Sequence, residues 1–271
     1  MKILLNNHTL NKELRRFNDI GFVPTMGGIH EGHISLIKRS QKHCNKTIVS
    51  IFINPKQFNS RNDFKNYPKN IKKDLAILKK IKGIDYIYIP KVKDIYKSKK
   101  KSKIFIDKKY KILCAKFRKG HFEGVLNVMD RFTELIRPHK IFMGKKDFQQ
   151  LFLVKNFIEQ KYKVKVIGCK TVRYKNKLAL SSRNYLLDNY ELTKAMEISQ
   201  ILFFIKRQIK NKRNINQFLT KKSKDLQKKF NIKIDYLELR SEKDLMLSNK
   251  TLNSKIFIAY YLNGIRLIDN I

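Results

Sequence analysis

The sequence predicts an α/β protein, in which a Rossmann-like, doubly wound parallel sheet is followed by a smaller α+β C-terminal domain. Three observations predict this class. Short β-branched runs alternate with helical periodicity up to about residue 171. A glycine-rich turn joins the first strong strand pattern to the helix pattern that follows it. Beyond residue 171 the alternation stops, so we expect two domains, at residues 1–171 and 172–271.

Five strands and four helices are expected in the first domain. The β-branched run Thr47–Ile53 predicts a strand that is buried on both faces. Apolar residues recur at helical spacing in Phe122–Arg137, and Pro138 ends that helix. The other expected strands are Ile20–Thr25, Asp85–Ile89, Lys140–Met143 and Val164–Ile167, and the other helices are Gly32–His43, Tyr67–Ile81 and Asp147–Gln160.

The second domain should begin with the irregular, polar stretch Val172–Asn184. Helices are then expected over Asn189–Lys212 and Ile215–Phe230, and strands over Ile234–Leu239 and Ile256–Leu262. No Pro-, Gly- or Ser-rich linker separates the two parts, so a short hinge should join them. We expect this smaller domain to close over the first as a lid.

The chain is strongly basic, with 61 Lys and Arg against 22 Asp and Glu and a formal net charge of +39. Such an excess is typical of proteins that bind nucleic acid or other polyanions. The basic residues are spread along the whole chain and are mostly Lys, so a general composition bias explains them more simply. No apolar run is long enough to span a membrane. The three widely spaced cysteines indicate reduced thiols and a cytoplasmic protein.

The most specific stretch runs from Val23 to His33. It contains two adjacent glycines, Gly27 and Gly28, and then a His-x-Gly-His sequence that starts at His30. Glycines allow close approach of the backbone to a ligand, and the N-terminus of the following helix favours a phosphate. An ordinary βα turn with structural histidines is the alternative. Two imidazoles around a glycine at such a junction favour nucleotide chemistry.

This stretch resembles the His-x-Gly-His signature of adenylyl-transferring enzymes, which include the class I aminoacyl-tRNA synthetases. Its wider form, Pro-Thr-Met-Gly-x-x-His-x-Gly-His, resembles the pantothenate synthetase family. Further blocks resemble that family in the same order along nearly the whole chain: Ser50–Phe58, Gly120–Val125, Gly144–Gln150, Leu178–Asn184 and Arg266–Asn270. The resemblance implies ATP-dependent condensation of (R)-pantoate with β-alanine to pantothenate. A pantoyl adenylate would be the intermediate, with pyrophosphate and AMP released.

The resemblance also implies the site residues. His30, His33 and Lys146 would be catalytic, with His33 as the general acid. Gln57 and Gln150 would bind pantoate, and Gln57 would also lie near β-alanine. The residues implied for ATP are Met26, Gly27, Gly28, Ile29, His30, Glu31, Gly32, His33, Gly144, Lys145, Lys146, Asp147, Val172, Leu180, Ser181, Ser182 and Arg183.

The residue types suit these roles. Lys146 is a compact cation for phosphates, and the hydroxyls of the Ser181–Arg183 segment with its guanidinium could form a second phosphate clamp. Glutamine amides can hydrogen-bond the hydroxyls and carboxylate of pantoate. Two positions depart from the family pattern. Lys145 replaces a glutamate, and Lys170 stands where a proline commonly precedes the next strand.

Mg²⁺ is expected to accompany ATP. Its ligands stay open between Asp74, Asp147 and the phosphate oxygens alone. Arg118 is expected near the substrate entrance, and Asp147 with Gln150 also forms a helix-capping pattern. We expect a homodimer by resemblance, with no specific nucleic-acid partner and no membrane association. Another adenylyltransferase of the superfamily, a polyanion-binding protein and an inactive relative are the rival interpretations.

Overall fold

The structure is a computed structural model that describes residues 1–96 and 104–271. These residues form two compact units. Unit 1 comprises Met1–Lys108, Arg118–Lys145 and Gln150–Lys170, and unit 2 comprises Lys109–Phe117, Lys146–Gln149 and Thr171–Ile271. Two short segments from the first part of the chain therefore belong to unit 2. The α/β class is confirmed, because one unit contains a parallel sheet with helices and the other a small antiparallel sheet.

Unit 1 is built on a six-stranded sheet in the order β1-β4-β3-β2-β5-β6, and every neighbouring pair is parallel. The strands are β1 (Lys2–Leu4), β2 (Ile20–Thr25), β3 (Lys46–Ile51), β4 (Tyr86–Tyr88), β5 (Lys140–Gly144) and β6 (Lys165–Cys169). The chain runs outward from β2 through β3 to β4, and then returns to place β5 on the other side of β2. Ligands of such sheets bind at the carboxyl ends of the strands where this reversal occurs. Here that position is the end of β2 and of β5.

Helices cover both faces of this sheet. Successive side chains of β2 point to opposite faces and therefore pack against different helices. Phe22 packs edge-to-face on Phe132 of α7 (His121–Ile136), with ring centroids 5.3 Å apart. Val23 belongs instead to a buried cluster with Ile37 and Leu78. These last two residues come from α2 (Glu31–His43) and α4 (Ile71–Lys79). The other α-helices that the structure describes before residue 171 are α1 (Asn7–Leu14), α3 (Arg61–Asn66), α5 (Val92–Tyr96), α6 (Cys114–Phe117) and α8 (Phe148–Lys161).

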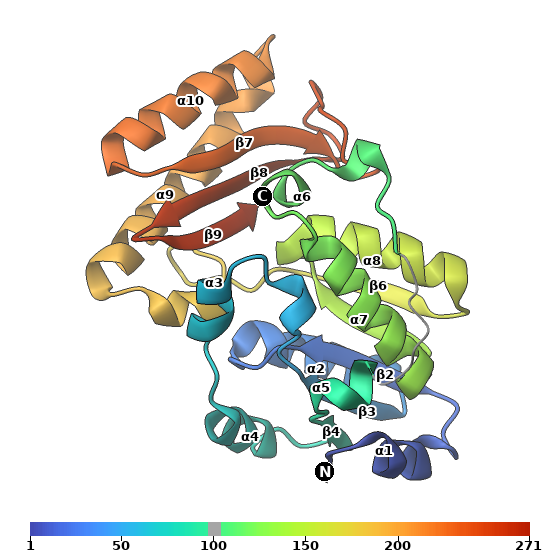
Figure 1. Cartoon of the computed structure of the whole chain (residues 1–271). Helices are drawn as coiled ribbons and strands as arrows, with labels where there is room; N and C mark the ends of the chain where they lie inside the picture. The colour runs from blue at the N-terminus through green and yellow to red at the C-terminus, as the bar shows by residue number, and fades with distance from the viewer. Residues whose placement is uncertain (97–103) are drawn as a thin grey trace. The chain divides into compact units, whose positions relative to one another are not determined.

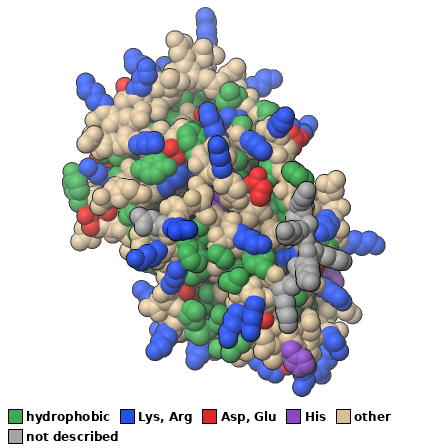
Figure 2. Space-filling model, viewed as in Figure 1, with side chains coloured by type: hydrophobic (Ala, Val, Ile, Leu, Met, Phe, Trp, Pro, Cys, Tyr) green, Lys and Arg blue, Asp and Glu red, His purple; other side chains and the backbone are tan. Residues whose placement is uncertain are grey.

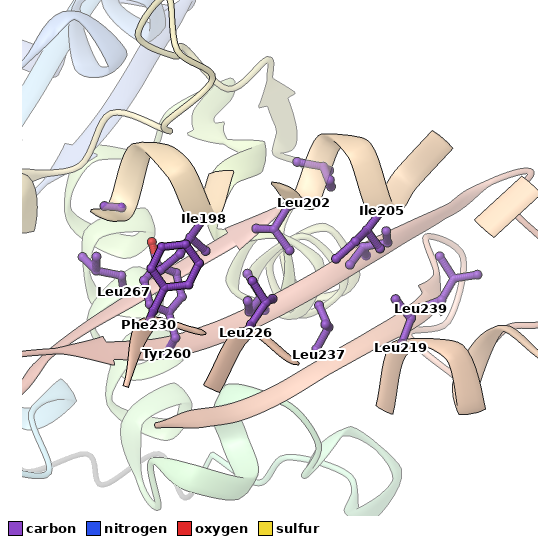
Figure 3. Close-up of a cluster of buried hydrophobic side chains, with 14 of the residues drawn as sticks. Ile198, Leu202, Ile205, Leu219, Leu226, Phe230, Leu237, Leu239, Tyr260 and Leu267 are labelled. Carbon is purple, nitrogen blue, oxygen red and sulfur yellow. The ribbon is translucent and has the colours of Figure 1, made fainter. Parts of the chain in front are cut away.

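Unit 2 contains the antiparallel sheet β7-β8-β9, formed by β7 (Ile234–Ser241), β8 (Ser254–Leu262) and β9 (Ile265–Asn270). Helices α9 (Asn189–Gln208) and α10 (Ile215–Phe230) cover one face of it (Figure 1). Leucine, isoleucine and aromatic side chains from both helices and all three strands meet in one buried cluster (Figure 3). This cluster supplies unit 2 with a hydrophobic core of its own.

Most expected elements are present, with three kinds of difference. The expected helix Tyr67–Ile81 is too long, because Asn70 caps the Lys73 N–H at 2.9 Å and α4 begins only at Ile71. The strand expected to reach Ile53 ends at Ile51. The sequence patterns did not reveal the short elements β1, α1, α3, α5 and α6 or the last strand β9.

Lys and Arg side chains are distributed over the molecular surface seen in Figure 2 and do not gather in one patch. On this face, the distribution agrees with a general composition bias better than with one dedicated polyanion site. Among the described residues, no helix is both long enough and apolar enough to cross a membrane.

Candidate active site

The glycine-rich turn after β2 is held by a buried carboxylate. Gly27 and Gly28 have positive φ angles of 85° and 62°, which favour glycine. The Gly28 N–H donates to Asp74 Oδ2 at 3.0 Å, and the Ile29 N–H donates to Asp74 Oδ1 at 2.8 Å. Asp74 is only 3% exposed. A Cβ atom at Gly27 would lie 2.7 Å from Asp74 Oδ2, so the turn and the carboxylate fit only with glycine there.

The two histidines of the motif cap the helix that follows. His30 is the N-cap residue of α2, and its Nδ1 accepts the Gly32 N–H at 3.0 Å. His33 Nδ1 accepts the His30 N–H at 3.4 Å. Because both Nδ1 atoms accept, the proton of each neutral imidazole lies on Nε2. The ring centroids are 4.1 Å apart, so the start of α2 carries two adjacent Nε2–H donors.

Gly32 leaves room for the ring of His30. A Cβ atom at this position would lie 2.6 Å from His30 Cε1 and 2.8 Å from His30 Nδ1. Real Cβ atoms essentially never make contacts this short. The spacing His-x-Gly-His therefore has a local steric cause in addition to any chemical one.

A second polar cluster lies where β3 ends. Asn54 donates through Nδ2 to Gln57 Oε1 at 3.1 Å and to the Gly124 carbonyl at 3.0 Å. Tyr96 donates to Asn54 Oδ1 at 2.7 Å, and burial raises the pKa of this phenol, which keeps it a neutral donor. The Gln57 amide N–H contacts Met26 Sδ. A thioether is a weak acceptor, so a ligand oxygen could readily replace it.

His121 fixes the main chain of Gln57. Its Nδ1 lies 2.7 Å from the Gln57 carbonyl oxygen, and its Nε2 lies 3.0 Å from Arg118 NH1. Since a guanidinium can only donate, Nε2 accepts and Nδ1 carries the proton. Arg118 also pairs with Asp63 at 3.6 Å. Arg118 thus belongs to a chain of contacts that runs from Asp63 through Arg118 and His121 to the Gln57 carbonyl.

Unit 2 contains Lys146 and the side chain of Asn270, which holds the Lys146 main chain. Lys146 lies in the 3-10 turn Lys145–Asp147, with Nζ 3.9 Å from Asp147 Oδ2. The Lys146 carbonyl accepts the side-chain amide of Asn270 at 2.6 Å. Arg173 NH2 in turn donates to the Asn270 carbonyl at 3.0 Å, and both of its terminal nitrogens bind Asp269, at 2.7 and 2.8 Å. The C-terminal strand therefore positions the expected catalytic lysine.

The polar stretch of unit 2 forms a short hairpin. Arg173 bridges Ala179, and the Leu180 N–H donates to the Val172 carbonyl at 3.0 Å. Ser181 then caps a 3-10 turn, Ser182–Leu186, by accepting the Arg183 N–H at 3.3 Å. The hairpin thereby brings Val172 next to Leu180, and the turn that carries Ser182 and Arg183 follows it directly, with Ser182 buried.

The expected site residues divide between the units. Unit 1 holds the run Met26–His33 with Gln57, Gly144, Lys145 and Gln150. Unit 2 holds Lys146, Asp147, Val172 and the segment Leu180–Arg183.

For the expected Mg²⁺, both oxygens of Asp74 already accept main-chain N–H groups. The contacts of this carboxylate are therefore those of an anchor for the glycine turn and not those of a metal ligand. Within residues 1–96 and 104–271 no three His, Cys, Asp or Glu side chains are grouped as metal ligands.

Sequence reasoning missed several supporting residues. Asn54 follows a buried strand and precedes a proline, which was a usable signal for its position at the sheet edge. Tyr96 and Asn270 come from segments far from the motif in sequence, and only the fold brings them to Asn54 and Lys146.

A parallel sheet whose reversal point carries a glycine turn and two helix-capping imidazoles defines an α/β protein of the nucleotide-binding class. Comparisons with known proteins then place the chain within that class. The family model described as Pantoate-beta-alanine ligase matches residues 2–271. A pantothenate synthetase of Flavobacterium psychrophilum is 39% identical over 257 residues, covering 93% of this chain and 91% of that protein.

Two solved structures resemble the fold over the whole chain. Pantothenate synthetase from Thermus thermophilus gives a TM-score of 0.89 at 28% identity, covering 100% of this chain and 99% of that one. A pantoate-beta-alanine ligase from Francisella tularensis, complexed with beta-gamma ATP and beta-alanine, gives 0.86 at 33% identity, covering 100% and 97%. The chain belongs to the pantoate-β-alanine ligase family.

Proposed function

We propose that this chain joins (R)-pantoate to β-alanine at the expense of ATP, with a pantoyl adenylate as intermediate. The observation that carries this proposal is the pair of imidazoles at the start of α2, whose Nδ1 atoms accept main-chain N–H groups, in a chain of this family. In the first step the pantoate carboxylate attacks the α-phosphorus, and the bond to pyrophosphate breaks. In the second step the β-alanine amine attacks the acyl carbon, loses a proton and displaces AMP.

His30 and His33 suit the first step because charge develops on the departing pyrophosphate. Their Nε2–H groups can donate to phosphate oxygens, and His33 can act as the general acid. Lys146 adds a cation for the same phosphates. Asn270 holds the Lys146 carbonyl and so limits where the side chain can reach.

Gln57 and Gln150 are proposed to bind pantoate. Asn54 orients the Gln57 amide through Oε1, which leaves its N–H group to bond a pantoate oxygen in place of the Met26 sulfur. Gln150 lies in the first turn of α8 with its side chain partly exposed. Because both groups are neutral, they can orient a carboxylate without reducing its nucleophilicity as a bound cation would.

The lid role of the C-terminal domain, 172–271, is also a proposal. The hairpin that carries Ser181, Ser182 and Arg183 supports it, since two hydroxyls and a guanidinium can clamp phosphates. Mg²⁺ would enter with ATP and neutralise phosphate charge. Of the two candidate carboxylates Asp147 fits better, because its side chain is 48% exposed.

We further propose a cytoplasmic homodimer. The three free, buried cysteines agree with a reducing compartment.

Pyrophosphate exchange into ATP tests the proposal. Purified protein with Mg²⁺ and pantoate should exchange label without β-alanine, and addition of β-alanine should then yield AMP and an amide product. His33→Ala and Lys146→Ala should each remove most of this exchange. Two matched controls should keep it: His43→Ala at the other end of α2, and Lys155→Ala on the exposed face of α8. Exchange driven by another carboxylate but not by pantoate would favour a different adenylyltransferase.

A further inference from the structure

Asp74 is a buried carboxylate that no step of the proposed reaction uses. It lies in the first turn of α4, and it is 3% exposed in a chain with a net charge of +39. Both of its oxygens face the glycine turn, at 3.0 Å from the Gly28 nitrogen and 2.8 Å from the Ile29 nitrogen. Burial of a charge without such partners would be costly, so these contacts account for its position.

We propose that Asp74 is a positioning residue for adenylation, because it fixes the turn that places His30 and His33. The inference rests on the proposed function. Ile29 is held twice, since its N–H binds Asp74 and its side chain is 1% exposed within the core cluster of unit 1. The next residue is His30, whose ring caps α2. A fixed main-chain amide at Ile29 therefore restricts the position of the His30 main chain, and with it the position of the His30 imidazole.

The chemistry of the turn requires a carboxylate rather than a carboxamide. Two main-chain N–H groups point at one side chain, and a carboxylate can accept both. In Asp74→Asn one of the two positions becomes an NH₂ donor, which would face another N–H group. We expect this isosteric change to leave the fold intact and to loosen the turn at Gly28 or Ile29.

Asp85 offers a matched control in the same unit. Its carboxylate also accepts a main-chain N–H, that of Thr47 at 2.9 Å, and it pairs with Lys46 at 2.8 Å. These contacts lie at the amino ends of β3 and β4, at the opposite edge of the sheet from the glycine turn. Asp85→Asn should thus remove the same kind of bond, from a main-chain N–H group to a carboxylate, as Asp74→Asn does. It should leave the glycine turn and the two imidazoles unaffected.

Steady-state exchange kinetics distinguish a positioning role of Asp74 from a role in protein stability alone. Asp74→Asn should lower kcat by about 100-fold, the size of effect expected for an imidazole displaced by roughly 1 Å. The KM for pantoate should stay within about threefold, because Gln57 is not disturbed. Asp85→Asn should keep the parent kcat even where its melting temperature falls. If Asp74→Asn keeps the parent kcat and loses only thermal stability, its role is structural and the inference is overturned.

Amide hydrogen exchange, resolved by NMR, tests the anchor without any turnover. The Gly28 and Ile29 amides of the parent protein should be protected, and Asp74→Asn should remove that protection while Asp85→Asn retains it. Unprotected amides in the parent overturn the inference even if the variant fails to fold. Protected amides in a parent that shows no pantoate-dependent exchange refute the proposed function, and with it the role of Asp74 in adenylation.

Discussion

Replacement of Gly32 by alanine should separate the activity of the site from the stability of the fold. The added Cβ would lie 2.6 Å from His30 Cε1, whereas an ordinary carbon contact begins near 3.4 Å. The ring of His30 or the start of α2 must therefore retreat by about 0.8 Å. This retreat also weakens the bond from the Gly32 N–H to His30 Nδ1, which measures 3.0 Å.

Two opposing terms make the expected change in stability small. The lost side-chain cap costs about 1 kcal/mol. Alanine in place of glycine near the start of a helix returns up to about 1 kcal/mol. The melting temperature should then change by less than about 4 °C. The displaced imidazole, in contrast, should lower kcat by about 100-fold.

Pyrophosphate exchange and thermal unfolding, measured on the same samples, check this prediction. Ser35→Ala is the control, because it removes a side-chain bond to the Gly32 carbonyl at 2.8 Å in the same helical turn and adds no atom next to the His30 ring. A double-mutant cycle with His30→Ala tests the cause. If Gly32→Ala acts through the His30 ring, it should have little further effect once that ring is absent. A folded Gly32→Ala protein with at least a third of the parent kcat would refute the reasoning.

Three further predictions concern other parts of the chain. Asn270→Ala leaves the Lys146 carbonyl without its side-chain donor, and should lower the exchange rate about tenfold, as measured by initial rates. Gly124→Ala would place a Cβ 2.1 Å from the Lys56 carbonyl oxygen, and should destabilise the fold by about 1–3 kcal/mol in urea unfolding and raise the KM for pantoate. Burial raises the pKa of the Cys44 thiol from 9.0 to about 11. Because the folded protein prefers the neutral thiol, the free energy of unfolding should fall between about pH 9 and pH 11, and Cys44→Ala should reduce this slope.

The long elements could be predicted because their patterns are strong. The helix pattern Ile215–Phe230 and the strand pattern Ile20–Thr25 match α10 and β2 residue for residue. Short elements could not be predicted, since β1 has only three residues and its pairing with β4 comes from distant sequence. The start of α4 depends on Asn70, whose capping role was hidden inside a longer apolar pattern.

The residue types of the site could be predicted from motifs, but their connections could not. Asp74 was a candidate for Mg²⁺, because an isolated carboxylate in a sequence carries no sign of its partners. Only the fold brings α4 to the turn after β2, 45 residues away along the chain, and gives both oxygens a main-chain donor. The assignment of the individual ATP and pantoate contacts stays a prediction that the proposed variants test.

The surroundings of the three histidines favour two different imidazole tautomers. Main-chain N–H groups occupy Nδ1 of His30 and His33, so these rings carry their protons on Nε2. The guanidinium of Arg118 occupies Nε2 of His121, so that ring carries its proton on Nδ1 and donates to the Gln57 carbonyl. The first two rings thus accept from the main chain through Nδ1, whereas the third donates to the main chain through Nδ1. The sequence shows three histidines in family motifs, and the hydrogen bonds of the fold decide which of them suit phosphate chemistry.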